Sequence, residues 1–123
     1  MPIPSRVLGA GTSGGTTIAI CGDVNASVAA AGSGAISTAT LLSAVISQVS
    51  TATAVSAIGV KLPPAEAGAT VFVANKSGVN ISVYPNDANT KINNGTAGAA
   101  VTIADKVGSQ FFAVSATEWY KVA

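Results

Sequence analysis

The sequence contains no histidine, a single cysteine and very little charge. Of its 123 residues, six are Lys or Arg and five are Asp or Glu, and none of these lies between Asp23 and Lys61. Histidine and clustered charged groups supply most acid–base, nucleophilic and metal-binding chemistry in proteins. We therefore expect that the chain is not an enzyme and that it has no catalytic, cofactor-binding or metal-binding residue.

Other shortages exclude further classes of partner. The six basic residues are spread among five acidic ones, so there is no basic stripe of the kind that binds nucleic-acid phosphates. Ser, Thr, Gln and Gly interrupt every long apolar segment, whereas a membrane-spanning helix needs about 20 mostly apolar residues in a row. We expect neither nucleic acid nor a membrane among the partners.

The apolar residues that are present are mostly small. The hydrophobic fraction is 49%, but aromatic residues make up only 5% of the chain, which also has 13 Gly residues. Small side chains bury little surface each, and ordering glycine carries an entropic cost. The sequence therefore predicts a marginal monomer that is stabilised by forming a homo-oligomer.

The second part of the chain has the pattern of a β protein. Short alternating segments, such as 69–75, 79–84 and 118–122, are separated by turn residues. This pattern predicts an all-β domain at residues 35–123, a compact antiparallel sandwich or small barrel. Residues 1–34 are rich in Gly and Ala and are predicted to form an extended N-terminal arm that orders against neighbouring subunits.

Residues 36–57 are ambiguous between helix and strand. Their apolar residues fit one face of a helix, but Ser, Thr, Val and Ile dominate the segment and favour strands. We predict a strand at about Ala44–Thr51. Because the uncharged stretch is long enough to line a shared interface, we also predict that its large apolar residues form the inter-subunit contact: Leu41, Leu42, Val45, Ile46 and Val49.

Aromatic residues cluster near the C-terminal end. Trp119 and Tyr120 follow Phe111 and Phe112 closely in the sequence. Such a cluster can be a stacking platform for sugars or bases, but in a chain this poor in aromatics it more often anchors the core. We place Trp119 in the core and keep Trp119 with Tyr120 as an alternative ligand platform.

Five short segments carry a resemblance to a known group of proteins. They are GVKLP at 59–63, AGATVFVAN at 67–75, VYP at 83–85, INNG at 92–95 and WY at 119–120. Over residues 36–123 the chain resembles the short β-rich virion proteins of tailed bacteriophages, of the head decoration, cement or head-fibre type. Proteins of that kind are typically trimers that reinforce the capsid lattice, and the resemblance implies no catalytic residue.

The resemblance implies a structural role on the outer surface of the capsid. The expected function is that of a capsid decoration (cement) protein in the virion, and the expected partners are the major capsid protein and further copies of this chain, most simply as a trimer. The alternative is a tail-fibre, baseplate or adhesin module that binds a host surface glycan through Trp119 and Tyr120.

Overall fold

The chain folds into short β-strands. The structure, a computed structural model, describes residues 22–53 and 58–122. In that part of the chain the only helical element is a 3₁₀ turn, η1 (Ile36–Thr38), so no helix there is long and apolar enough to cross a membrane. The prediction of an all-β protein is confirmed.

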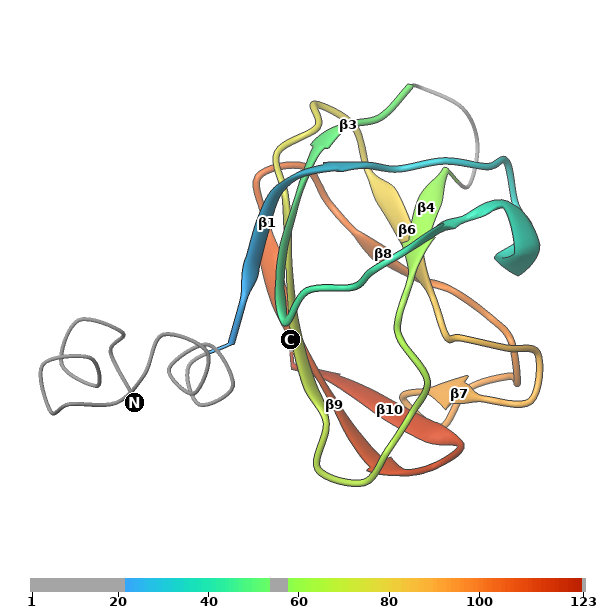
Figure 1. Ribbon diagram of the computed structural model, residues 1–123. Helices are drawn as coiled ribbons and strands as arrows, with labels where there is room; N and C mark the ends of the chain where they lie inside the picture. Colours follow the sequence, from blue (N-terminus) through green and yellow to red (C-terminus); the bar gives the residue numbers. More distant parts are fainter. Residues whose placement is uncertain (1–21, 54–57, 123) are drawn as a thin grey trace, which may run out of the picture.

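The strands form two sheets that face each other across the core (Figure 1). The larger sheet contains, in spatial order, β1 (Val24–Ala29), β3 (Ile46–Thr51), β5 (Thr70–Asn75), β9 (Gly108–Ser115), β10 (Glu118–Val122) and β7 (Lys91–Ile92). The smaller sheet contains β2 (Thr40–Leu41), β4 (Gly59–Lys61), β6 (Ile81–Tyr84) and β8 (Val101–Ile103).

The chain alternates between the two sheets from β1 to β8, which makes the first half of the molecule parallel. In the larger sheet β1 pairs with β3 and β3 with β5, both in parallel. In the smaller sheet β2 pairs with β4 and β4 with β6, also in parallel. Two successive strands, one in each sheet, therefore form one coil, and each coil stacks on the next. The antiparallel strand pairs all involve β8, β9 or β10.

This arrangement corrects the prediction of an antiparallel sandwich or small barrel. The coils resemble those of a short β-solenoid. The antiparallel prediction was wrong because it treated each turn between alternating segments as a hairpin. Parallel neighbours cannot be joined by a tight turn, so the chain must cross to the other sheet before it returns.

The corner after β5 shows how such a turn redirects the chain. Asn75 is 2% exposed, and its amide nitrogen donates to the carbonyl oxygens of Val79 (2.8 Å) and Ile103 (3.2 Å). Its amide oxygen accepts from the backbone N–H of Ser77 (3.1 Å) and from the Ser77 hydroxyl (2.7 Å). The buried amide therefore holds the chain at a corner between the sheets, and β5 and β6 lie in different layers.

The predicted boundary between the N-terminal arm and the β domain, at residues 34 and 35, falls after the first strand of the larger sheet. Residues 1–21 are outside the described part of the chain, but β1 lies within the predicted arm of residues 1–34 and pairs with β3. Asp23 begins this contact, because its carbonyl oxygen accepts from the N–H of Ile46 (2.9 Å) and its carboxylate from the N–H of Val45 (2.9 Å). The end of the predicted arm is thus built into the larger sheet.

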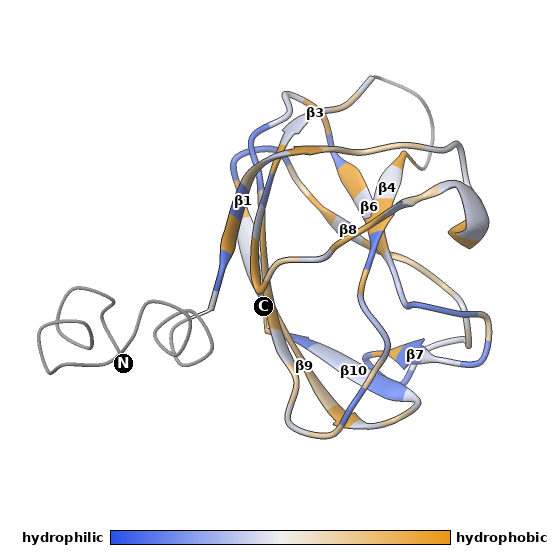
Figure 2. Ribbon diagram, viewed as in Figure 1, coloured by the Kyte–Doolittle hydropathy of each residue, from blue (hydrophilic) through white to orange (hydrophobic). Residues whose placement is uncertain are grey.

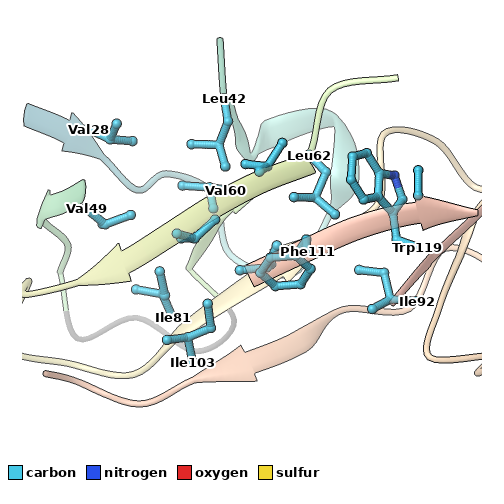
Figure 3. Packing of buried hydrophobic residues seen from close by; sticks show 14 residues of the cluster. Val28, Leu42, Val49, Val60, Leu62, Ile81, Ile92, Ile103, Phe111 and Trp119 are labelled. Carbon is cyan, nitrogen blue, oxygen red and sulfur yellow. The ribbon is translucent and has the colours of Figure 1, made fainter. Parts of the chain in front are cut away.

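The core lies between the two sheets and is made mostly of aliphatic side chains (Figure 3). Phe111 and Trp119 are its largest members, and both are 0% exposed. The prediction that Trp119 anchors the core is confirmed. Its indole N–H has no hydrogen-bond partner in the described part of the chain, so Trp119 contributes through packing.

The ambiguous segment forms the strand that its β-branched residues favour. β3 spans Ile46–Thr51, within the predicted strand at 44–51, and alternate residues of it are buried. Leu42 and Val49, which fit one face of a helix in the sequence, are both buried in the core. They reach the core from different elements, since Leu42 follows β2 and Val49 lies in β3. The strand prediction is confirmed.

Candidate functional site

The outer face of the larger sheet carries a group of apolar side chains, although it faces away from the core. Strand register aligns one residue from each of five strands in a row across it. The paired residues are Val24 on β1, Ile46 on β3, Phe72 on β5, Gln110 on β9 and Val122 on β10. Val24 is 64% exposed and Val122 47%, and the three residues between them are half-buried.

A second row of the same face carries the aromatic residues. Thr70, Phe112 and Tyr120 are Cα partners on β5, β9 and β10. The rings of Phe112 and Tyr120 stack with their centroids 5.9 Å apart. We call these two rows together the apolar face; its members are Val24, Ile46, Thr70, Phe72, Gln110, Phe112, Tyr120 and Val122.

A shallow hollow lies in the apolar face around Gly108, at the start of β9. It has a volume of ≈ 490 Å³, and Phe72, Gln110 and Val122 contribute to its walls. Gly108 has no side chain to fill the space, and an added Cβ there would meet no atom closer than 3.9 Å. The hollow therefore offers room for a group from a partner to enter the face.

Two charged residues lie beside the apolar face at one corner. Glu118 on β10 and Lys91 on β7 are Cα partners there, and Figure 2 shows a hydrophilic part of β10 near β7, which is itself part hydrophilic and part hydrophobic. The Tyr120 hydroxyl donates to Oε2 of Glu118 at 3.3 Å. Desolvation of the phenol and the nearby Glu118 carboxylate raise the pKa of Tyr120, so the phenol is neutral at ordinary pH. The members of the face itself are uncharged.

The structure separates the five residues that were predicted to contact another subunit. Leu42 is 2% exposed and Val49 0%, so both belong to the core of their own chain and are not available to a partner. Leu41 on β2 is 51% exposed, Val45 is half-buried beside β3, and Ile46 lies on the apolar face. The prediction was wrong for Val49 because alternate residues of β3 point to opposite sides, and for Leu42 because it follows the end of β2 and packs into the core.

The predicted ligand platform is also divided. Trp119 and Tyr120 are adjacent in β10 and so point to opposite faces, with Trp119 in the core and Tyr120 outside. Only Tyr120 remains available for stacking, and its neighbour in that role is Phe112. A platform made by Trp119 itself is ruled out by its burial.

Sequence reasoning missed several members of the apolar face. Phe72, Phe112 and Val122 each occupy an outward position in a strand whose alternate residues are buried. Two apolar residues in succession, as at Phe111 and Phe112, were the available signal, because one of such a pair must point outward. Which outward residues meet on one surface depends on strand order and register.

The arrangement can bind a partner through apolar contact. The described residues include no group of three or more Cys, Asp or Glu side chains placed to hold a metal ion. Contact over the face would remove apolar and aromatic surface from water, which is the main driving force in protein association.

Comparison with known proteins identifies no relative. No protein-family model, no curated protein and no solved structure is significantly similar to this chain. The function of the chain is therefore inferred from its residues and their geometry.

Proposed function

We propose that this chain is a structural virion protein, a decoration (cement) protein that binds the outside of a bacteriophage capsid as a homo-oligomer, with a trimer as the simplest form. It acts without catalysis, by covering and reinforcing the major capsid protein. The apolar face is the observation that carries the proposal. It combines aromatic and aliphatic side chains, with two charged residues beside it at one corner, which suits a broad contact with another protein.

The strength of such attachment depends on how many copies act together. A standard protein interface buries about 800 Å² on each partner. Because binding also carries entropic and desolvation costs, an interface of that size does not by itself ensure tight binding. Copies that bind a repeating lattice as one oligomer gain effective concentration for the second and later contacts. A small, neutral contact on each subunit is therefore sufficient for a stable coat.

The test is attachment to purified phage particles. Phe72→Asp places a charge at the centre of the apolar face and should abolish cosedimentation with particles, since an unpaired charge is costly to bury. Val107→Asp is the matched control, because Val107 is 39% exposed and lies in the turn before β9, outside the face. Equal binding by both variants would contradict attachment through this face.

Cryo-electron microscopy of the particle tests the location. We expect density for this chain on the head, in a number of copies comparable to the major capsid protein. Density on the tail alone, or none on the particle, would contradict the decoration role.

The second candidate is a tail-fibre, baseplate or adhesin module that binds a host glycan. It is favoured by the stacked pair Phe112 and Tyr120, which lies one row away from Gln110 and Val122 in the wall of the hollow. Aromatic faces and amide groups together suit sugar rings, which have apolar faces and hydroxyl groups. Binding to a glycan array that is lost in Tyr120→Ala would support this candidate, and a low copy number per particle would separate it from the decoration role.

A further inference from the structure

The two ends of the stacked coils differ in how their edge strands are protected. Among residues 22–53 and 58–122, β1 is the edge of the larger sheet at one end and β2 is the edge of the smaller sheet. β1 has six residues, Val24–Ala29, with no charge and no proline. A strand of this kind presents backbone donors and acceptors to solvent, and natural proteins usually avoid leaving it open.

The opposite end carries the usual protection. β7 has two residues, one of them Lys91, and β8 has three, followed by Asp105 and Lys106. Short strands and charged side chains prevent edge-to-edge pairing. Beside β7, the side chain of Asn93 accepts from the N–H of Lys121 at 2.8 Å, which further occupies that edge. β2 has two residues and is as short as β7, so β1, which is six residues long and uncharged, is the edge strand that lacks these devices.

The backbone at the start of β1 is oriented for pairing outward. The carbonyl oxygen of Asp23 accepts from Ile46 on β3. Backbone groups of successive strand residues alternate between the two sides of the strand. The N–H and C=O of Val24 therefore point away from β3, toward the side of β1 on which no described strand pairs; we call this side the open edge.

The second half of β1 is less suited to a new neighbour. A register shift separates Asn25 from Val28, and the N–H of Ser27 is taken by the Asn25 side chain at 3.1 Å. The carbonyl oxygen of Ala29 accepts from the Thr40 hydroxyl at 2.6 Å. Pairing at this edge is thus confined to the first residues of β1, around Val24.

We propose that the open edge binds a second copy of this chain, with the two β1 strands antiparallel across a twofold axis. Two identical edges can pair in this way because each donates and accepts at the same residue. The residues of β1 are uncharged, and the carboxylate of Asp23, just before the strand, is held by the N–H of Val45. Val24 and Ile46 also continue the apolar face to the edge, so the two copies would place four apolar side chains together at the junction.

The pairing of two β1 strands would enlarge the surface that the proposed function uses, although the pairing does not depend on that function. A twofold axis perpendicular to the sheet puts the apolar faces of both copies on the same side. The joined surface is then twice as wide as that of one chain. A threefold assembly built through another surface is compatible with this contact only as a dimer of trimers.

Sedimentation of the full chain over a range of concentrations tests the proposal. We expect the native protein to form a reversible dimer or another even-numbered assembly. Val24→Pro removes the outward N–H without removing a bond to β3, and Val24→Thr is the matched control that keeps the donor. Because the change occurs twice at a twofold contact, Val24→Pro should raise the dissociation constant about a hundredfold, and Val24→Thr should change it little.

A second substitution keeps the test decisive if Val24→Pro fails to fold. Val24 is 64% exposed, so Val24→Lys should fold and should separate the copies by repulsion between like charges. Val122→Lys adds the same charge to the apolar face four strands away and should leave self-association intact. If Val122→Lys abolishes particle attachment but not self-association, attachment through the apolar face and dimerisation through β1 are separate properties.

Amide exchange identifies the contact itself. Exchange of the Val24 N–H should slow about tenfold when about nine-tenths of the chains are paired, and should be fast when the protein is dilute. A protein that stays monomeric at every concentration overturns the proposal, as does an oligomer that survives both Val24→Pro and Val24→Lys. Slow exchange of Val24 in a dilute monomer also overturns it, because the edge would then be covered by the same chain.

Discussion

Gly59→Ala should lower the free energy of unfolding more than a glycine-to-alanine substitution at another strand position. Gly59 begins β4 and pairs with Ser82 on β6. A Cβ built on Gly59 would overlap the carbonyl oxygen of Ser82 and lie 3.0 Å from its carbonyl carbon. Because both of these atoms belong to a neighbouring backbone, no side-chain rotation can relieve the overlap.

The size of the effect follows from the hydrogen bonds around that position. Gly59 exchanges two backbone hydrogen bonds with Ala31, each 3.0 Å long, and Ser82 donates to Ile58 at 2.8 Å. Moving β4 far enough from β6 to admit a methyl group disrupts all three. At about 1 kcal/mol for each bond, Gly59→Ala should lower the free energy of unfolding by about 3 kcal/mol. For a domain of this size that corresponds to a fall in Tm of roughly 12 °C.

Gly108→Ala is the matched control. Gly108 also begins a strand, but an added Cβ would have its nearest neighbour 3.9 Å away. Alanine there should be neutral or should stabilise the fold by about 0.5 kcal/mol, because it restricts the unfolded chain. Urea unfolding of both variants, followed by the fluorescence of Trp119, gives the comparison. If the two variants differ by less than about 0.5 kcal/mol, the close approach of β4 and β6 is refuted.

Three further predictions concern the core and two titrating groups. Val49→Ala should lower the free energy of unfolding by about 2 kcal/mol in urea without changing particle attachment, because Val49 is 0% exposed; a change in attachment alone would place Val49 at an interface. Hydrogen bonds from the Thr90 hydroxyl and a backbone N–H lower the pKa of Asp87. This stabilisation is present above the unfolded pKa of about 4 and is lost as pH falls through the folded value. Thr90→Val should therefore weaken the acid dependence of unfolding, and an unchanged pH profile would count against it. Desolvation and Glu118 raise the pKa of Tyr120, so stability should fall as pH rises above about 10. In Glu118→Gln, ultraviolet titration should give a lower pKa for Tyr120, although not its ordinary value, because desolvation remains; no change would exclude the carboxylate as a cause.

Local sequence determined many of the strands after residue 44 and which residues alternate within them, but it did not predict β1. The β-branched residues around Ile46 predicted the strand that forms there, and the scarcity of aromatics predicted Trp119 as a core anchor; both are confirmed. Alternation also indicates that neighbours such as Phe111 and Phe112 point to opposite sides. These features depend on interactions within a few residues, so they can be read from a short window of sequence.

Only the tertiary structure decided which strands pair, in which direction, and which side of each strand faces the core. Asn75 reads as the end of a strand before a hairpin, yet its amide bonds to Val79 and Ile103 and turns the chain into the other sheet. Val49 lies in the core and Ile46 lies on the apolar face. The smaller sheet covers only one side of β3, and the sequence of β3 does not say which side that is. Such choices depend on contacts between residues far apart in the chain, which a pattern with a period of two cannot specify.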